Sequence, residues 1–186
     1  MQTPSSNKGF TLVEMLITVT ILAILLNIGI PSFQGMFKRA RSDADTERIA
    51  QIIRFARAYA ISQNSEVTTC FSDDLFACNR RASKAIMVFK DSNLNRKADA
   101  GETVEFAKLD DDSAQVLFNM SVGRHYIRHR PNGTVKEFGH ITYCPGDADI
   151  QYATRLIISR MGRARAAKDE DGDGIVNAAN GDNVVC

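Results

Sequence analysis

A cluster of cations near the C-terminal end of the chain is the first group of side chains whose types and spacing could do chemistry. Arg163 and Arg165 alternate across Ala164, so in an extended segment both side chains would point the same way and could straddle phosphate groups. Between Thr154 and Lys168 there is no acidic residue, and the cations are Arg155, Arg160, Arg163, Arg165 and Lys168. Neutralising a handful of phosphates would supply sequence-independent affinity that falls steeply with added salt.

The alternative interpretation of these arginines is structural. From residue 169 onward the charged residues are all acidic, namely Asp169, Glu170, Asp171, Asp173 and Asp182. The arginines would then form the solvated end of a strand, or pair internally with this acidic run. The net charge of +1 conceals this division of charge along the chain.

A lone acid in an apolar run is the second candidate. Residues 10–30 are almost wholly apolar, about the length of helix needed to cross a bilayer of ~30 Å, and Glu14 is the only ionisable residue among them. A carboxylate in hydrocarbon costs a few kcal/mol unless it is paired or protonated, so Glu14 is a functional candidate. The alternative is that its side chain reaches the membrane edge.

Two acidic segments have the oxygen-ligand spacing of calcium loops. Positions 1, 3, 5, 9 and 12 of the first are Asp91, Asn93, Asn95, Asp99 and Glu102. Against calcium, Arg96 replaces the glycine that the sharp turn prefers, and no flanking helix pair is predicted, so a solvated hairpin tip is favoured. The second comprises Asp169, Asp171, Asp173 and Asn177, with Asn180 where a bidentate glutamate is expected. No other cofactor is expected.

The cysteines indicate an oxidising compartment such as the periplasm. Cys70, Cys78, Cys144 and Cys186 lie far from the apolar run, and no histidine spacing near them resembles a zinc site. Four cysteines allow three connectivities, of which we favour Cys70 with Cys78 and Cys144 with Cys186. The first pair would close a short loop, and the second would tie down the C-terminal segment.

Composition and motifs argue against an enzyme. The 186 residues, 44% hydrophobic and 24% charged, suit one globular domain plus the apolar segment. There is no phosphate-cradling glycine loop, nucleophile elbow or metal-binding histidine pair.

Periodicity predicts an α+β head on a long helix. Helical spacing continues beyond Pro31 to about Gln63, with an apolar stripe at Ile49, Ile52, Ile53, Ala56, Tyr59 and Ala60. Strands are predicted at 67–70, 85–90, 103–108, 115–120, 125–130, 135–143 and 154–160. Turn signals such as Pro131-Asn132-Gly133 separate them, so the stripe should pack on an antiparallel sheet.

The N-terminal segment resembles a known signal. Residues 8–16, Lys-Gly-Phe-Thr-Leu-Val-Glu-Met-Leu, are similar to the class III signal of type IV pilins and pseudopilins. The resemblance implies a type IV pilin fold, cleavage by a prepilin peptidase between Gly9 and Phe10, and N-methylation of Phe10. It also implies that Glu14 pairs with the free amine of a neighbouring subunit during assembly, because two costly charges then neutralise each other.

This resemblance sets the expected domains and location. Residues 1–9 would be the leader, 10–33 a transmembrane and assembly helix, and 34–186 a periplasmic head. The subunit would sit as a single-pass protein in the inner membrane and then join other pilins in a fibre at the cell surface.

A second resemblance concerns the cationic tail. Gly162-Arg163-Ala164-Arg165 is similar to the GRxR motif of FimT-type minor pilins in the GspH/FimT family. The motif implies DNA binding for natural transformation through Gly162, Arg163 and Arg165, and charge alone adds Arg160 and Lys168. A second basic cluster, Arg124, His125, Arg128, His129 and Arg130, would widen the footprint; the alternative, which is the commoner case, is a strand solvated on one face. The alternative is a structural minor pilin or type II secretion pseudopilin that primes assembly without binding DNA.

Overall fold

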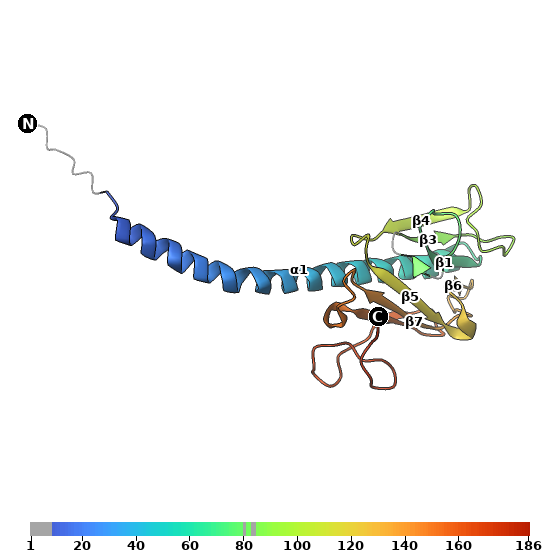
Figure 1. Ribbon diagram of the computed structural model, residues 1–186. Helices are drawn as coiled ribbons and strands as arrows, with labels where there is room; N and C mark the ends of the chain where they lie inside the picture. The colour runs from blue at the N-terminus through green and yellow to red at the C-terminus, as the bar shows by residue number, and fades with distance from the viewer. Residues whose placement is uncertain (1–8, 80, 83–84) are drawn as a thin grey trace, which may run out of the picture. The chain divides into compact units, whose positions relative to one another are not determined.

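One long helix, α1 (Leu12–Ser62), opens the computed structural model, which describes residues 9–79, 81–82 and 85–186 (Figure 1). The helix ends one residue from the predicted end and continues through Pro31 without interruption. The chain divides into two units, one ending at Phe37 and one running from Lys38 to Cys186. Residues 1–8 of the expected leader lie outside the described residues.

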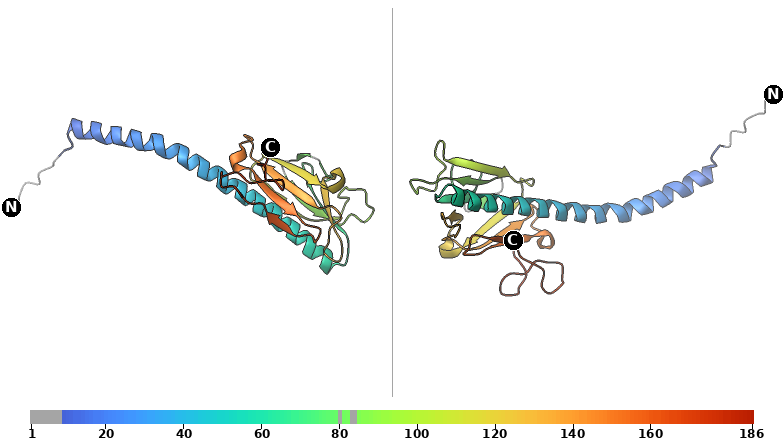
Figure 2. Two further views of the ribbon diagram at one scale, coloured as in Figure 1. Left: turned by 90° about the horizontal axis from the view of Figure 1, so that it is seen from below. Right: turned by 180° about the vertical axis from the view of Figure 1, so that it is seen from behind.

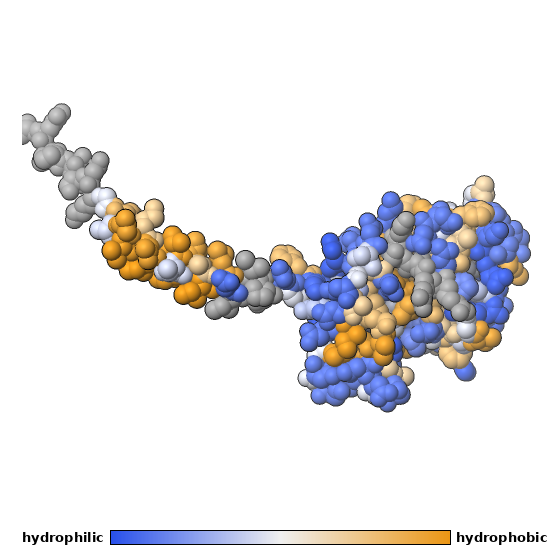
Figure 3. Space-filling model, viewed as in Figure 1, coloured by the Kyte–Doolittle hydropathy of each residue, from blue (hydrophilic) through white to orange (hydrophobic). Residues whose placement is uncertain are grey.

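A reciprocal cap starts α1 in the first unit. Thr11 Oγ1 accepts the N–H of Glu14 at 3.2 Å, and the Glu14 carboxylate accepts the N–H of Thr11 at 3.5 Å. The apolar side chains that follow are exposed, for example Leu16 and Leu25, and they cover much of this part of the helix (Figure 3). Among the described residues, no helix combines the length and apolar character that a membrane span requires.

The head contains two antiparallel sheets rather than the single sheet expected. The first has the order β4-β3-β1-β6, built from β1 (Val67–Ser72), β3 (Ala85–Phe89), β4 (Thr103–Lys108) and β6 (Tyr126–His129). The second has the order β2-β5-β7-β8-β9, built from β2 (Arg81–Ala82), β5 (Gln115–Met120), β7 (Gly139–Cys144), β8 (Thr154–Ile158) and β9 (Ala164–Ala166). Two 3₁₀ turns, Ser121–Gly123 and Ile150–Tyr152, complete the head.

The segment 134–138 explains why β7 begins later than predicted. Val135 forms a single bridge with His129 of β6, and its N–H donates to Arg160 O at 3.1 Å, just beyond β8. One residue therefore contacts both sheets, so the segment crosses between them and cannot extend either ladder. The predicted strand 135–143 was wrong in its first four residues.

The core lies where the second half of α1 meets both sheets. Ile49, Ile53 and Ala56 are completely buried, and they share one cluster with Ile86 of the first sheet and Ile141 of the second. Strands of both sheets lie alongside this part of the helix (Figure 2). The apolar stripe is therefore confirmed as the core face, and each fully buried isoleucine contributes about 2 kcal/mol.

A buried carboxylate fixes α1 against the second sheet. Asp45 is completely buried, and it accepts hydrogen bonds from the Tyr143 hydroxyl at 2.9 Å and from Asp110 N at 2.7 Å. Burial and the neighbouring carboxylate raise the pKa of Tyr143, so its hydroxyl stays a donor. This network sets how α1 lies on β7.

Both disulfides of the structure follow the pairing that the sequence favours. Cys70 is bonded to Cys78, and Cys144 is bonded to Cys186. The second bond holds the end of the acidic segment against β7 (Figure 1).

Candidate nucleic-acid interface

The arginine pair lies on the β8–β9 hairpin at one edge of the five-stranded sheet. Arg165 pairs with Ile157, and Ala164 pairs with Ile158. Arg163 directly precedes β9, and its carbonyl accepts the N–H of Ser159 at 3.0 Å. The extended conformation assumed for this segment is therefore present, and strand alternation places Arg163 and Arg165 on the same side.

Gly162 is needed where the hairpin turns. Its φ is +71°, and a Cβ built on it would lie 2.3 Å from the carbonyl oxygen of Gly133. Any side chain would have to push the 159–163 turn away from the Pro131-Asn132-Gly133 turn. Only glycine permits this close approach without strain.

One guanidinium from α1 fastens the two turns together. Arg57 Nε donates to Gly133 O and to Met161 O, at 3.1 Å in each case. The turn that presents Arg163 is thus bonded to the longest helix in the molecule, which limits its motion.

The arginine pair is open to solvent and carries uncompensated charge. Arg163, Arg165 and Lys168 are exposed, and within the described part of the chain no carboxylate lies within 4.0 Å of any of them. Arg160 is also exposed, and its guanidinium lies over the Phe138 ring, 4.5 Å from the ring centroid. The predicted site residues therefore gather on one hairpin and the turn that closes it.

The outer face of the sheet adds a further cation. Arg155 alternates with the buried Leu156 and so points outward, where its Nε donates to Thr142 Oγ1 at 3.1 Å. His140 pairs with Ile157 on this face, and partial burial together with the charge of Arg155 lowers the pKa of His140. His140 therefore stays neutral at pH 7, and Arg155 and Arg165 supply the charge.

The acidic run lies at the opposite end of the hairpin from the turn. Ala167 N donates to Arg155 O at 2.8 Å, so the ladder continues past β9 before the chain reaches Asp169. Six residues along the chain separate Arg163 from Asp169, whereas Lys168 directly precedes the acidic run. The internal pairing considered as the alternative is not found among the described residues.

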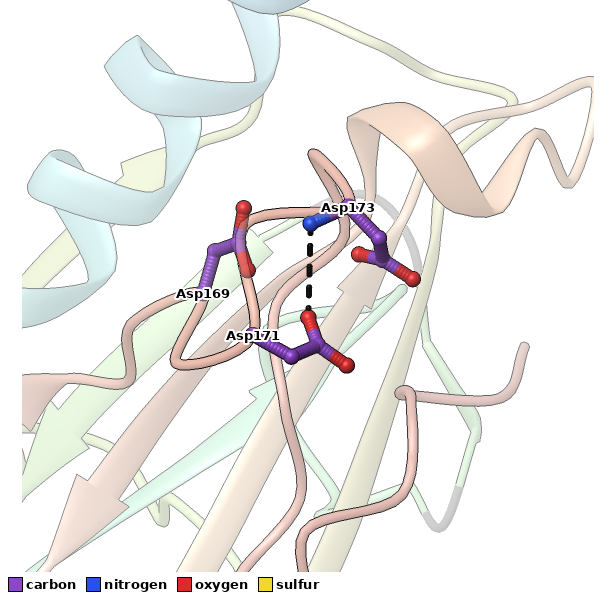
Figure 4. Close-up of side chains that lie close together, drawn as sticks. All are labelled: Asp169, Asp171 and Asp173. Carbon is purple, nitrogen blue, oxygen red and sulfur yellow. Dashed lines mark hydrogen bonds between the residues drawn. The ribbon is translucent and has the colours of Figure 1, made fainter.

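The carboxylates of this run lie close together. Oxygens of Asp169, Asp171 and Asp173 are all within 4.8 Å of one another, and all three residues are exposed (Figure 4). Backbone N–H groups of Gly174 and Gly172 donate to Asp169 and lower the pKa of its carboxyl group. These two donors therefore stabilise the charged form of Asp169.

Comparison with known proteins identifies the head. Residues 45–162 match the model of a family described as type II transport protein GspH, which covers more than half of the chain. The chain belongs to the GspH family. Residues 4–26 match the prokaryotic N-terminal methylation motif.

Other relatives of this GspH-family chain are pilus components. Over 58 residues it is 40% identical to the Type IV wide pilus major component PilA4 of Thermus thermophilus, a match covering 31% of this chain and 44% of that protein. Over 70 residues it is 37% identical to the narrow pilus major component PilA5 of the same organism, covering 38% and 58%. The chain thus spans about half the length of these curated relatives.

A solved structure supports the fold. The minor pilin FimU of Pseudomonas aeruginosa is 13% identical and superposes with a TM-score of 0.54, over 72% of this chain and 92% of that one. The expected type IV pilin fold of the GspH-family chain is confirmed.

Much of the second basic cluster of the GspH-family chain is paired with a carboxylate or buried in the head. Arg128 donates through its backbone N–H and its guanidinium to the buried Glu137, at 3.1 and 3.3 Å, and Arg124 Nε lies 3.9 Å from the same carboxylate. His129 is completely buried. Arg124, Arg128 and His129 therefore serve the packing of the head, whereas Arg130 is half-buried beside the Pro131-Asn132-Gly133 turn and has no ion pair among the described residues.

Sequence reasoning missed two features of the interface. Arg155 was counted among the cations of its segment but was not assigned to the site. Its contact with Thr142 of β7 depends on the register between β7 and β8, which the sequence does not reveal. Arg57 lies on α1, and no sequence signal links it to the turns at Gly133 and Met161, which lie far along the chain.

Proposed function

We propose that this GspH-family chain is a minor pilin of a type IV pilus, and that its β8–β9 hairpin binds extracellular double-stranded DNA for uptake in natural transformation. Phosphates would be contacted by Arg163 and Arg165, with Arg160 and Lys168 at the margins. The FimT-type GRxR motif gives the same assignment by resemblance.

The observation that carries this proposal is the exposed, unpaired arginine pair on a fixed turn. The Cα atoms of two residues one strand period apart lie about 6–7 Å apart, and two long, exposed arginine side chains on one side of a strand can each contact a phosphate group of a duplex. Because Gly162 and Arg57 hold the turn in place, little conformational freedom is lost on binding.

The N-terminal segment supports the setting. In this proposal a prepilin peptidase cuts between Gly9 and Phe10 and methylates Phe10, and residues 10–33 anchor the subunit in the inner membrane. The head faces the periplasm before Glu14 pairs with a neighbouring subunit's amine and the chain enters the fibre. The methylation motif over residues 4–26 supports this processing.

The first prediction tests the arginine pair directly. The full chain in a non-ionic detergent should bind a short duplex of random sequence, measured by fluorescence anisotropy at several salt concentrations. Arg163→Ala with Arg165→Ala should weaken binding and lower the slope of log K against log salt by about 2, because two phosphate contacts are lost.

A charge-matched control separates this site from general attraction. Lys90→Ala with Lys108→Ala removes two exposed cations from the first-sheet side of the head and should leave affinity nearly unchanged. If the parent chain does not bind, or if both double variants bind equally well, the DNA-binding proposal is wrong.

The second candidate function is a purely structural role in fibre assembly, and the extent of the family match favours it. The family match ends at Gly162, so Arg163 and Arg165 lie outside the matched residues. A structural minor pilin or pseudopilin that primes fibre assembly would need no DNA-binding hairpin, and failure of the test above would favour it.

A further inference from the structure

A closed loop between β3 and β4 holds a carboxylate oxygen without a partner. Asp91 is 5% exposed, and its Oδ1 atom is buried with no hydrogen-bond partner, while Oδ2 accepts the N–H of Arg96 at 3.1 Å. Because Arg96 belongs to the same loop, the carboxyl group faces the loop interior. Leaving a carboxylate oxygen buried and unbonded is costly, and a bound cation would supply the missing partner.

We propose that residues 91–102 form a Ca²⁺ site. The oxygen ligands would be the side chains of Asp91, Asn93, Asn95 and Glu102, the carbonyl group of Lys97, and Asp99 directly or through water. Oxygen-only ligands on a twelve-residue loop suit a hard cation of flexible coordination, and there is no nitrogen or sulfur ligand to favour zinc.

The backbone already has the form that such a site needs. Arg96 stands at position 6, where glycine is usual, yet its φ is +63°, in the left-handed region that glycine favours. Its N–H then reaches position 1, the Asp91 carboxylate. The turn therefore forms even though Arg96 stands where glycine is usual.

The carboxylates of the loop have only neutral donors. Asp99 accepts from the side-chain amides of Asn93 and Asn95, at 2.9 and 2.8 Å, and Glu102 accepts the N–H groups of Ser92 and Asp99, both at 3.2 Å. No ion pair to Asp91, Asp99 or Glu102 occurs among the described residues. Three carboxylates thus belong to one small loop, and none of them has an ion-pair partner in the described part of the chain.

Nearby basic side chains do not fill that role. The Lys97 ammonium lies over the Phe76 ring, 5.6 Å from the ring centroid, and Arg96 is exposed. The amide oxygens of Asn93 and Asn95 each accept one backbone N–H, from Asn95 and Lys97, and keep a second lone pair for a cation.

The loop is anchored at its ends and in its middle. Lys90 N donates to Glu102 O at 3.0 Å, closing the ends, and Ala98 N donates to Phe76 O at 2.7 Å. Ala98 is buried in a small cluster with Cys70, whose disulfide to Cys78 holds the neighbouring segment. A site held in this way pays little ordering cost on binding a cation.

The acidic run at residues 169–173 also brings carboxylates together, so it is a second candidate for calcium binding. Its three carboxylates are exposed, and each accepts N–H groups from the run itself, so no buried oxygen there lacks a partner. Only the 91–102 loop is therefore proposed to bind calcium, and the experiment must distinguish this loop from the acidic run.

The test uses the full chain in non-ionic detergent after removal of divalent cations. Titration with CaCl₂, followed by calorimetry and thermal unfolding, should show one ion bound with Kd on the order of 10⁻⁴ M and a rise in Tm of about 5–10 °C at 10 mM. Asp91→Asn and Glu102→Gln should each weaken binding at least tenfold, whereas Asp171→Asn should leave it unchanged.

Two further results separate a metal site from a merely structural loop. Without calcium, Asp91→Asn should be at least as stable as the parent chain, because the unpaired buried charge is gone. Arg96→Gly should tighten calcium binding several-fold, because it relieves the strained φ and removes a nearby positive charge. Any one of three results would overturn the proposal: no Tm shift at 10 mM CaCl₂, an equal Tm shift with MgCl₂, or loss of calcium binding only in Asp171→Asn.

Discussion

His129 is a buried titratable group directly beneath the arginine turn. It is completely buried, and its ring carbon Cδ2 lies 3.2 Å from where a Cβ on Gly162 would be. Burial, and to a smaller extent the charge of Arg57, lowers the pKa of His129 from 6.5 to about 4, although a backbone contact with Gly162 opposes the shift. The ring is therefore neutral in the folded head at pH 7.

This pKa predicts acid sensitivity in a defined window. Above pH 6.5 the histidine is neutral in both states, and between pH 6.5 and 4 only the unfolded chain takes up the proton. The free energy of unfolding should therefore fall by about 3 kcal/mol across that range. Urea unfolding of the full chain at several pH values measures it.

His129→Leu supplies the control for the acid window. The substitution keeps an apolar side chain of similar volume, so most stability at pH 7.5 should remain while most of the pH dependence disappears. A small residual slope is expected from His140, whose pKa is also lowered. An unchanged slope in His129→Leu would show that other groups titrate.

At the scale of elements, the β8–β9 hairpin depends on how closely two turns pack. Gly162→Ala must place a Cβ against Gly133 O and adopt a positive φ. We expect a loss of about 2–4 kcal/mol in the free energy of unfolding together with weaker DNA binding, because Arg163 is displaced. Denaturant unfolding and anisotropy measure the two effects.

Gly172→Ala is the matched control. Its φ is +81°, but no atom lies within 4 Å of the position that a Cβ would take, so only the conformational cost of about 1 kcal/mol applies. Equal losses for Gly162→Ala and Gly172→Ala would contradict the packing role assigned to Gly162.

Most elements could be predicted from the sequence because their signals are local. The helix stripe and turn signals such as Pro131-Asn132-Gly133 mark the second half of α1 and seven of the strands, although β7 begins later than predicted. The disulfide pairing was one choice among three connectivities, and the structure has that pairing. The division into two sheets could not be predicted, because it depends on Val135 bridging both sheets. The short strands β2 and β9 carry too few residues to show an alternating pattern.

At the scale of the whole molecule, Glu14 links the chain to its proposed assembly. Its carboxylate caps its own helix through a 3.5 Å contact with Thr11 N, a weak bond that a neighbouring amine could replace. Glu14→Ala should reduce incorporation into purified pili at least tenfold, measured by quantitative immunoblotting, because the proposed pairing of charges is lost.

Glu14→Gln tests whether charge is the cause. It keeps the side-chain oxygen that accepts from Thr11 N but removes the charge, so it should behave like Glu14→Ala. Normal incorporation of either variant, with the protein present in the membrane fraction at the parent level, would refute the pairing role of Glu14.

The position of β9 in the sheet has one more consequence. In the order β2-β5-β7-β8-β9 it has a strand neighbour on one side only, so some of its peptide groups have no ladder partner. An open edge of this kind invites a strand from another molecule, and charged side chains are the usual protection. Arg163 and Arg165 interrupt a run that otherwise reads Met161, Gly162, Ala164, Ala166 and Ala167. The charges that we propose attract DNA would thus also keep neighbouring heads from aggregating edge to edge.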